Sequence, residues 1–137
     1  MVGGLRLRTL CPPDPGLPSE DPNLNAVVLA ASFGEADVFL PADAESEVTA
    51  RLPLGAFEIL KVAHHGSEDP GLERQLRLLR PEVAVISAGR DNDYGHPRPE
   101  TLAAPAAVPG LALYRTDQHG RVVVETDGHG FRVRTGG

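Results

Sequence analysis

The stretch that decides the fold is residues 57–67, FEILKVAHHGS. Its first part, residues 57–63, is a short and mostly apolar run, which favours a buried strand. His64 and His65 follow this run directly and precede a Gly-Ser pair, residue types that are typical of a tight turn. In open α/β sheets, ligands gather where a strand ends and a loop begins. We therefore expect an α/β fold that presents both histidines at the edge of a sheet.

Strands and helices are expected on both sides of this stretch. Upstream, residues 5–10 (LRLRTL) alternate as a strand does, and the apolar runs 25–31 and 37–40 predict a hairpin. The other predicted elements are helices at 44–52, 70–80 and 99–104 and strands at 82–88, 111–115, 121–125 and 131–134. The order β-β-β-α-β-α-β-α-β-β-β indicates a layered α/β domain with a mixed sheet and flanking helices. In the second helix the inward residues are Leu72, Leu76 and Leu79, and Arg74, Arg77 and Arg80 form a solvated face.

Composition limits the possible functions. A chain of 137 residues suits one domain, and 41% hydrophobic with 23% charged residues is ordinary for a soluble protein. The net charge of −6 disfavours nucleic-acid binding by bulk electrostatics, although it allows a nucleic-acid substrate at a metal site. The single cysteine, Cys11, excludes an internal disulfide and a cysteine zinc cage. With no apolar run of membrane-spanning length and no signal-peptide core, the polypeptide taken alone is expected to be soluble.

Three polar clusters follow predicted strands, namely Pro41-Ala42-Asp43, residues 64–67, and residues 92–97 (NDYGHP). Such spacing would bring one carboxylate and two or three imidazoles to the same edge of a sheet. These ligands suit zinc, manganese or iron, and a bound metal lowers the pKa of its water. The sequence therefore favours metal-assisted hydrolysis. Nucleophile-elbow, phosphate-loop and H-E-x-x-H motifs are absent, so other hydrolytic chemistries are disfavoured.

Each of these residues also has a simpler interpretation. Asp43 is a good N-cap for a helix that begins at Ala44. The His64–His65 pair could lie on the surface, and His96, between Gly and Pro, could be a loop histidine without a role. Tyr94 and Ser67 are weakly signalled substrate contacts. We interpret two further histidines, His119 and His129, as solvated turn residues.

Five segments together resemble a known family: residues 23–29 (NLNAVVL), 39–47 (FLPADAESE), 60–67 (LKVAHHGS), 85–97 (VISAGRDNDYGHP) and 114–120 (YRTDQHG). Their order and spacing are similar to those of the carboxy-terminal metallo-β-lactamase-like domain of ComEC-type DNA-internalisation competence proteins. The resemblance implies half of an αββα metallohydrolase sandwich. It also implies a role in natural transformation, as a metal-dependent nuclease beside a membrane channel for single-stranded DNA.

The resemblance also implies a set of site residues. Asp43 matches the family's acidic metal ligand, and His64 or His65 matches a later histidine ligand; these three are the expected catalytic residues. His96 matches the histidine of the Gly-His-Pro block, as a ligand or as a phosphate contact. Two divalent ions, zinc or manganese, are expected in the complete domain. The substrate-binding residues are then expected to be Ser67, Asn92, Tyr94 and His96.

The chain departs from the family pattern in two ways. Pro41-Ala42-Asp43 stands where the family has Thr-Gly-Asp, so the turn that presents Asp43 is expected to differ. The H-x-H-x-D-H motif of the amino-terminal half and the membrane region are missing. We therefore expect residues 1–137 to be a single partial domain, inactive alone, from a membrane-associated protein that carries the domain on the extracytoplasmic side. Its expected partners are the missing half-domain, the channel region and DNA. The alternatives are a lactone or thioester hydrolase and a non-catalytic assembly module.

Overall fold

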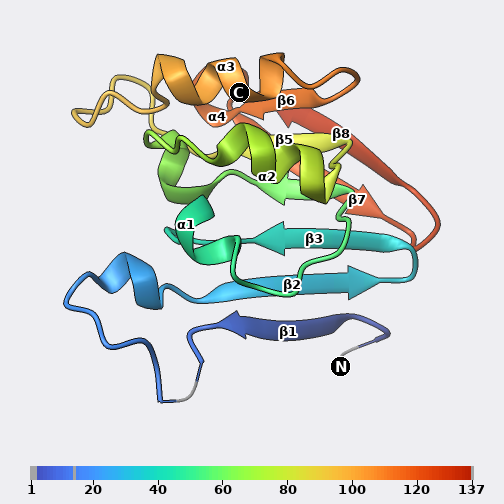
Figure 1. The fold of residues 1–137 in the computed structure, drawn as a ribbon. Helices are drawn as coiled ribbons and strands as arrows, with labels where there is room; N and C mark the ends of the chain where they lie inside the picture. The colour runs from blue at the N-terminus through green and yellow to red at the C-terminus, as the bar shows by residue number, and fades with distance from the viewer. Residues whose placement is uncertain (1–2, 14, 137) are drawn as a thin grey trace.

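The computed structural model describes residues 3–13 and 15–136, and it shows a mixed α/β fold (Figure 1). Six strands form one sheet in the order β1-β2-β3-β4-β5-β6: β1 (Arg6–Cys11), β2 (Val28–Phe33), β3 (Ala36–Leu40), β4 (Ile59–Lys61), β5 (Val83–Ile86) and β6 (Ala112–Arg115). Strands β1, β2 and β3 pair antiparallel, whereas β3, β4, β5 and β6 run parallel. The expected fold class, a mixed sheet with flanking helices, is confirmed.

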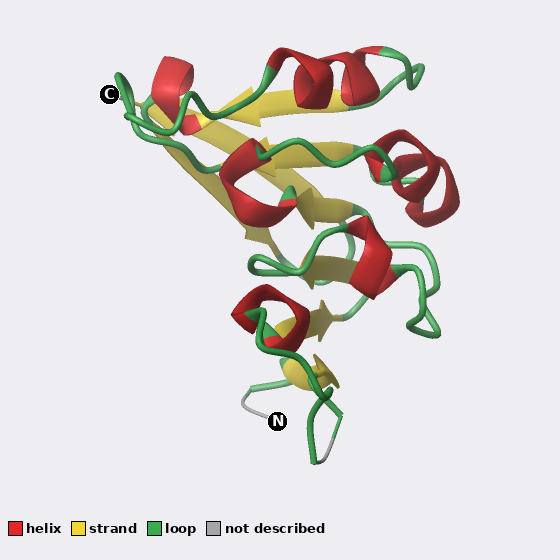
Figure 2. Cartoon of the chain, turned by 60° about the vertical axis from the view of Figure 1, so that its left-hand side comes forward, coloured by secondary structure: helices red, strands yellow, loops and turns green. Residues whose placement is uncertain are grey.

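The helices between β3 and β6 cover one face of the sheet, and a separate hairpin crosses the other (Figure 2). The helices are α1 (Ser46–Thr49), α2 (Leu72–Leu79), α3 (Pro99–Ala106) and α4 (Thr116–His119), with 3₁₀ turns η1 (Pro22–Asn25) and η2 (Ala63–Gly66). The hairpin consists of β7 (Arg121–Thr126) and β8 (Phe131–Gly136), which pair antiparallel as the sequence predicts. Val122 and Val124 of the hairpin line the same pocket as Val38 and Val85 of the sheet.

The core lies between the sheet and the helices. Leu72, Leu76 and Leu79 of α2 are buried, as the helical spacing predicts, and the predicted outward arginines are exposed. The three leucines pack with sheet residues of the same core cluster, among them Phe39, Leu60 and Ile86. Because α2 follows β4 and α3 follows β5, this core fixes the loops that leave those two strands.

Several predicted elements are shorter in the structure, and one helix was missed. The helix expected at 44–52 is reduced to α1, and the strand expected at 57–63 is reduced to β4. Helix α4 was not predicted because Thr116–His119 is only one turn long and polar throughout. The order of the predicted elements is otherwise that of the structure.

The expected helix-capping role of Asp43 is wrong. Helix α1 begins at Ser46, and Glu45 occupies the N-cap position without a side-chain cap bond. The first turn is satisfied from another segment, since Asp69 Oδ2 accepts the Ser46 N–H at 2.8 Å. Asp43 therefore lies outside the helix, which leaves its carboxylate available for another role.

Strand β1 is an outer strand of the sheet, and its apolar side chains are only partly covered. Leu7 is 59% exposed and Leu5, just before the strand, is 36% exposed. Arg6 and Arg8 alternate with Leu7, and charged residues of this kind discourage strand pairing between chains. Within residues 3–13 and 15–136, no helix combines the length and the apolar character needed to cross a membrane.

Candidate functional site

The polar clusters that follow β3, β4 and β5 meet at one edge of the sheet. Because these strands are parallel neighbours, the loops at their carboxyl ends emerge side by side. A cavity of about 390 Å³ lies between them, lined by Asp43, His64, His65, Ala88, Gly89, Asn92, Tyr94 and His96. Of the residues that the sequence nominates, only Ser67 is not part of this lining. Ser67 instead packs behind the site, where its carbonyl accepts the Thr101 hydroxyl at 2.6 Å.

The turn that presents Asp43 has a left-handed residue. Ala42 has φ of 52°, a region that alanine disfavours and glycine enters freely. Ala42 therefore adopts a backbone conformation for which glycine is suited, and the expectation that this turn differs from that of the family stays a prediction. Its carbonyl accepts the His64 N–H at 3.0 Å, which ties the Asp43 turn to the histidine turn.

The histidine turn is also built from left-handed residues. His64 and His65 have φ of 48° and 55°, and Gly66 follows with φ of 82°. Two consecutive non-glycine residues in this region are costly, and such outliers gather at functional sites. A Cβ on Gly66 would lie 2.7 Å from Pro97 Cβ, so only glycine lets the histidine turn approach the 92–97 loop this closely. The Gly66 carbonyl accepts the Arg98 N–H at 2.9 Å and holds the two loops together.

The protonation of His64 and His65 follows from their hydrogen-bond partners. His64 Nδ1 lies 2.9 Å from Glu45 Oε1, and His65 Nδ1 lies 2.8 Å from the Ser87 carbonyl oxygen. An ionised carboxylate and a carbonyl can only accept, so Nδ1 of each ring carries the proton. In the neutral ring, Nε2 then keeps its lone pair. This arrangement, with Nδ1–H held by an oxygen and Nε2 free, is the one that metal-binding histidines adopt.

Asp43 and His65 are the pair best placed to share a cation. His65 Nε2 lies 4.0 Å from Asp43 Oδ1, which is too long for a hydrogen bond. Two zinc bonds of about 2.0–2.2 Å span 4.0 Å only at an angle well above the tetrahedral one, so the two side chains must move slightly toward each other to share one ion. Within residues 3–13 and 15–136, however, no group of three His, Cys, Asp or Glu side chains is close enough to hold a metal. The donor set fits a divalent metal in kind but supplies too few ligands to enclose it.

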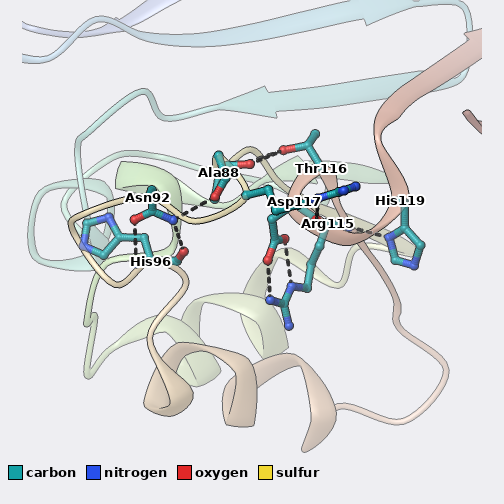
Figure 3. Close-up of polar contacts among 9 residues, drawn as sticks. Ala88, Asn92, His96, Arg115, Thr116, Asp117 and His119 are labelled. Atoms are coloured by element: carbon teal, nitrogen blue, oxygen red, sulfur yellow. Dashed lines mark hydrogen bonds and ion pairs between the residues drawn. The ribbon is translucent and has the colours of Figure 1, made fainter. Parts of the chain in front are cut away.

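His96 joins the site through a loop that Asn92 holds closed (Figure 3). Asn92 Oδ1 accepts the His96 N–H at 3.0 Å, and Asn92 Nδ2 donates to the carbonyls of His96 at 2.5 Å and Gly89 at 2.9 Å. The His96 ring is edge-on to His64 with centroids 6.0 Å apart. Partial burial lowers the pKa of His96, with contributions from Arg98 and the two other histidines, so its neutral form is favoured. The Asn92 amide thus bonds to the loop backbone through both its oxygen and its nitrogen, and little of its hydrogen-bonding capacity remains for a substrate.

A second polar cluster supports the cavity wall from behind. Thr116 Oγ1 donates to the Ala88 carbonyl at 2.8 Å and accepts the Ala88 N–H at 2.9 Å (Figure 3). Arg115 and Asp117 form a two-bond ion pair, and the Arg115 N–H donates to His119 Nδ1 at 2.9 Å. His119 is exposed, as expected for a solvated turn residue, and its ring also accepts the Arg115 N–H at the start of α4. The YRTDQHG segment therefore shapes the site without lining it.

Sequence reasoning missed Glu45 and Ser87. Glu45 lies two residues after Asp43, yet only the folded turn brings its carboxylate to His64, and Ser87 contributes through its backbone. Lys61 lies on the hairpin side of the sheet, where burial lowers its pKa and the Asp43 carboxylate partly opposes that effect. The signal for both missed residues was their place in the sequence, since Glu45 follows closely on the strand predicted at 37–40 and Ser87 lies at the end of the strand predicted at 82–88.

Comparison with known proteins identifies two relatives. The chain is 33% identical over 125 residues to ComE operon protein 3 of Bacillus subtilis, an alignment that covers 88% of the chain and 16% of that protein. It is 38% identical over 78 residues to Recombination protein 2 of Haemophilus influenzae, which covers 55% of the chain and 10% of that protein. The chain is homologous to part of each. It thus spans about a sixth or less of the length of these relatives. No family model matches the sequence, and no solved structure matches it significantly.

Proposed function

We propose that this chain is the carboxy-terminal part of a ComEC-type metallo-β-lactamase-like domain, and that it supplies one side of a metal-dependent site for DNA hydrolysis. Support comes from the homology to ComE operon protein 3 over most of the chain and from the likeness of the sequence motifs. The names of the two relatives, a Com operon product and a recombination protein, favour a role in DNA uptake during transformation. The mixed sheet with helices on one face is compatible with half of an αββα sandwich.

The observation that carries the proposal is the convergence of Asp43, His64 and His65 on one cavity, with Nδ1 of each imidazole held by an oxygen acceptor. A bound divalent ion would supply Lewis acidity and a water of lowered pKa at this position. Asp43 and His65 would hold it, and Glu45 orients the ring of His64 in the same cavity. His96, favoured in its neutral form, would donate or accept a hydrogen bond at the phosphate.

The number of metal ligands in this chain determines whether the isolated chain can be active. Since the described residues provide no three-ligand cluster, further ligands must come from elsewhere in the complete domain. We expect the purified 137-residue chain to have no EDTA-sensitive nuclease activity. Robust cleavage of DNA by this chain alone would show that it holds a complete site, and would refute the division into two halves.

The test uses the complete domain of the longer protein on linear DNA and on small lactones and thioesters. The proposal expects EDTA-sensitive cleavage of DNA and a loss of roughly 100-fold or more in Asp43→Asn, since metal Lewis acidity contributes several kcal/mol. Glu47→Gln is the matched control because Glu47 is exposed, lies in the same segment and does not line the cavity. Hydrolysis of the small esters without cleavage of DNA would move the domain to the alternative substrate class.

A role as an assembly module is a second candidate, favoured by one observation. The outer strand β1 leaves the side chain of Leu7 largely exposed, and because Arg6 and Arg8 disfavour strand pairing, such a module would use this side chain and not the strand edge. A change of Leu7 to Lys would weaken association with a partner without affecting a metal site at the ends of β3, β4 and β5, because β2 separates β1 from those strands. If the Leu7→Lys variant associates as the wild type does, the assembly role is refuted and the hydrolase proposal is the one that remains.

A further inference from the structure

Tyr94 is the exposed aromatic residue at the rim of the candidate site. Its residue exposure is 76%, the highest among the large hydrophobic residues in the described part of the chain, and it lines the cavity that contains Asp43 and His65. A single exposed apolar side chain needs no explanation on a plain surface. Here it is placed beside the acid and the imidazoles, so its position calls for a binding role.

The ring of Tyr94 continues a series of aromatic rings that leads into the site. Tyr94 stacks on His96 with centroids 5.9 Å apart and planes at 28°, and His96 meets His64 edge-on at 6.0 Å. His96 therefore supports one side of the Tyr94 ring, while the high exposure of Tyr94 leaves the rest of the ring open to a ligand. A flat ligand that stacks on Tyr94 would extend this series outward by one ring.

The loop that carries Tyr94 is held in one conformation. The side chain of Asn92 bonds to both the N–H and the carbonyl of His96 and to the carbonyl of Gly89, which closes the loop around Tyr94. The Gly66 carbonyl holds the Arg98 N–H at the end of the loop. Because the loop is already ordered, a ligand that stacks on Tyr94 pays little conformational entropy.

Charge around the ring limits what kind of binding is possible. Arg90 and Arg98 lie on the loop together with Asp91 and Asp93, so the loop has no net charge from these four residues, and the chain carries −6. Attraction of a phosphate backbone by bulk charge is thus weak. Stacking of a base on an aromatic ring does not depend on net charge and tolerates any base. The loop is suited to hold a base and not to clamp a duplex backbone.

We propose that Tyr94 is a stacking platform for an unpaired nucleobase, and that the strand which enters the site is therefore single-stranded or has a frayed end. A base inside a duplex has both faces covered by its neighbours, so it has no free face for Tyr94. This inference deepens the proposed function, on which it rests for the choice of nucleic acid. The base on Tyr94 would place the adjoining phosphodiester in the cavity between His96 and Asp43.

The test uses the purified chain in EDTA, which removes metal binding from the measurement. The ¹⁵N-labelled chain is titrated with an eight-nucleotide oligothymidine and, separately, with a blunt duplex of the same length. Saturable shifts of the residues 89–98 with the single strand and smaller shifts with the duplex are expected. Tyr94→Phe should bind within about twofold of the wild type, and Tyr94→Leu should lose roughly 5- to 150-fold, the range of base–aromatic stacking.

Tyr114→Phe is the matched control, since Tyr114 is the second tyrosine and its ring packs against His119 away from the cavity. Equal affinity of Tyr94→Leu and wild type, equal binding of the duplex, or no saturable shift would overturn the inference.

Failure of this inference can be distinguished from failure of the proposed function. If the complete domain cleaves DNA and Tyr94→Leu leaves its KM unchanged, the stacking role of Tyr94 is refuted and the proposed nuclease function stands. If oligothymidine binds through Tyr94 but the complete domain does not hydrolyse DNA, the nuclease function is refuted and the stacking role of Tyr94 stands.

Discussion

Replacement of Gly66 by alanine should loosen the contact between the histidine turn and the 92–97 loop. Gly66 has φ of 82°, which costs a non-glycine residue about 1–2 kcal/mol. A Cβ there would also lie 2.7 Å from Pro97 Cβ and 3.3 Å from Ile86 Cγ2. Overpacking of this kind costs a further ~1–3 kcal/mol. Gly66→Ala is therefore expected to destabilise the chain by about 2–5 kcal/mol.

The assay is urea unfolding of the purified chain, with Gly110→Ala as the control. Gly110 has φ of 79°, close to that of Gly66, but a Cβ there meets no atom within 4 Å. Gly110→Ala thus measures the cost of backbone strain alone, about 1–2 kcal/mol. The difference between the two variants measures the steric conflict with Pro97. If both variants lose the same stability, Gly66 is needed for its backbone conformation only, and the account of the loop contact is wrong.

Three further predictions concern residues that shape the site. Ala42→Gly should raise the free energy of unfolding by about 0.5–1 kcal/mol, because it relieves the positive φ at the Asp43 turn, and a decrease would contradict that reading. Glu45→Ala should reduce the fraction of His64 that is protonated on Nδ1, as measured in ¹⁵N NMR spectra, and should lower the metal affinity of the complete domain about 10- to 100-fold. An unchanged tautomer would show that Glu45 does not orient the ring. Asp117→Asn should cost about 1–3 kcal/mol at pH 7 through loss of the pair with Arg115. Hydrogen bonding by Arg115 lowers the pKa of Asp117 below the unfolded value of about 3.9, so this stabilisation is complete above that pH and is lost as the pH falls through the folded pKa. A wild-type to variant difference that stays constant in unfolding scans from pH 7 to pH 2 would contradict the assignment.

The fold was largely predictable because its signals are local. The apolar spacing of Leu72, Leu76 and Leu79 and the short apolar run of β5 each define an element without knowledge of the rest of the chain. The parallel arrangement of β3, β4 and β5 then brings the ends of these strands together, so the meeting of Asp43, His64 and His96 followed from the order of elements.

Other features depend on contacts between distant residues and could not be predicted. The capping assignment of Asp43 failed because Asp69, far along the chain, accepts the Ser46 N–H and fixes where α1 begins. The role of Glu45 depends on the left-handed turn at His64, which no propensity predicts for a histidine. The role of the YRTDQHG segment was likewise hidden, since Thr116 reaches Ala88 only after β5 and β6 have paired.

The most direct test of a metal site at this sheet edge is anomalous diffraction from crystals of the complete domain grown with manganese. We predict an anomalous peak within about 2.0–2.2 Å of both Asp43 Oδ1 and His65 Nε2, with Glu45 still bonded to His64 Nδ1. A bound manganese ion that contacts neither Asp43 nor His65, or no ion at this edge at saturating manganese, would contradict it.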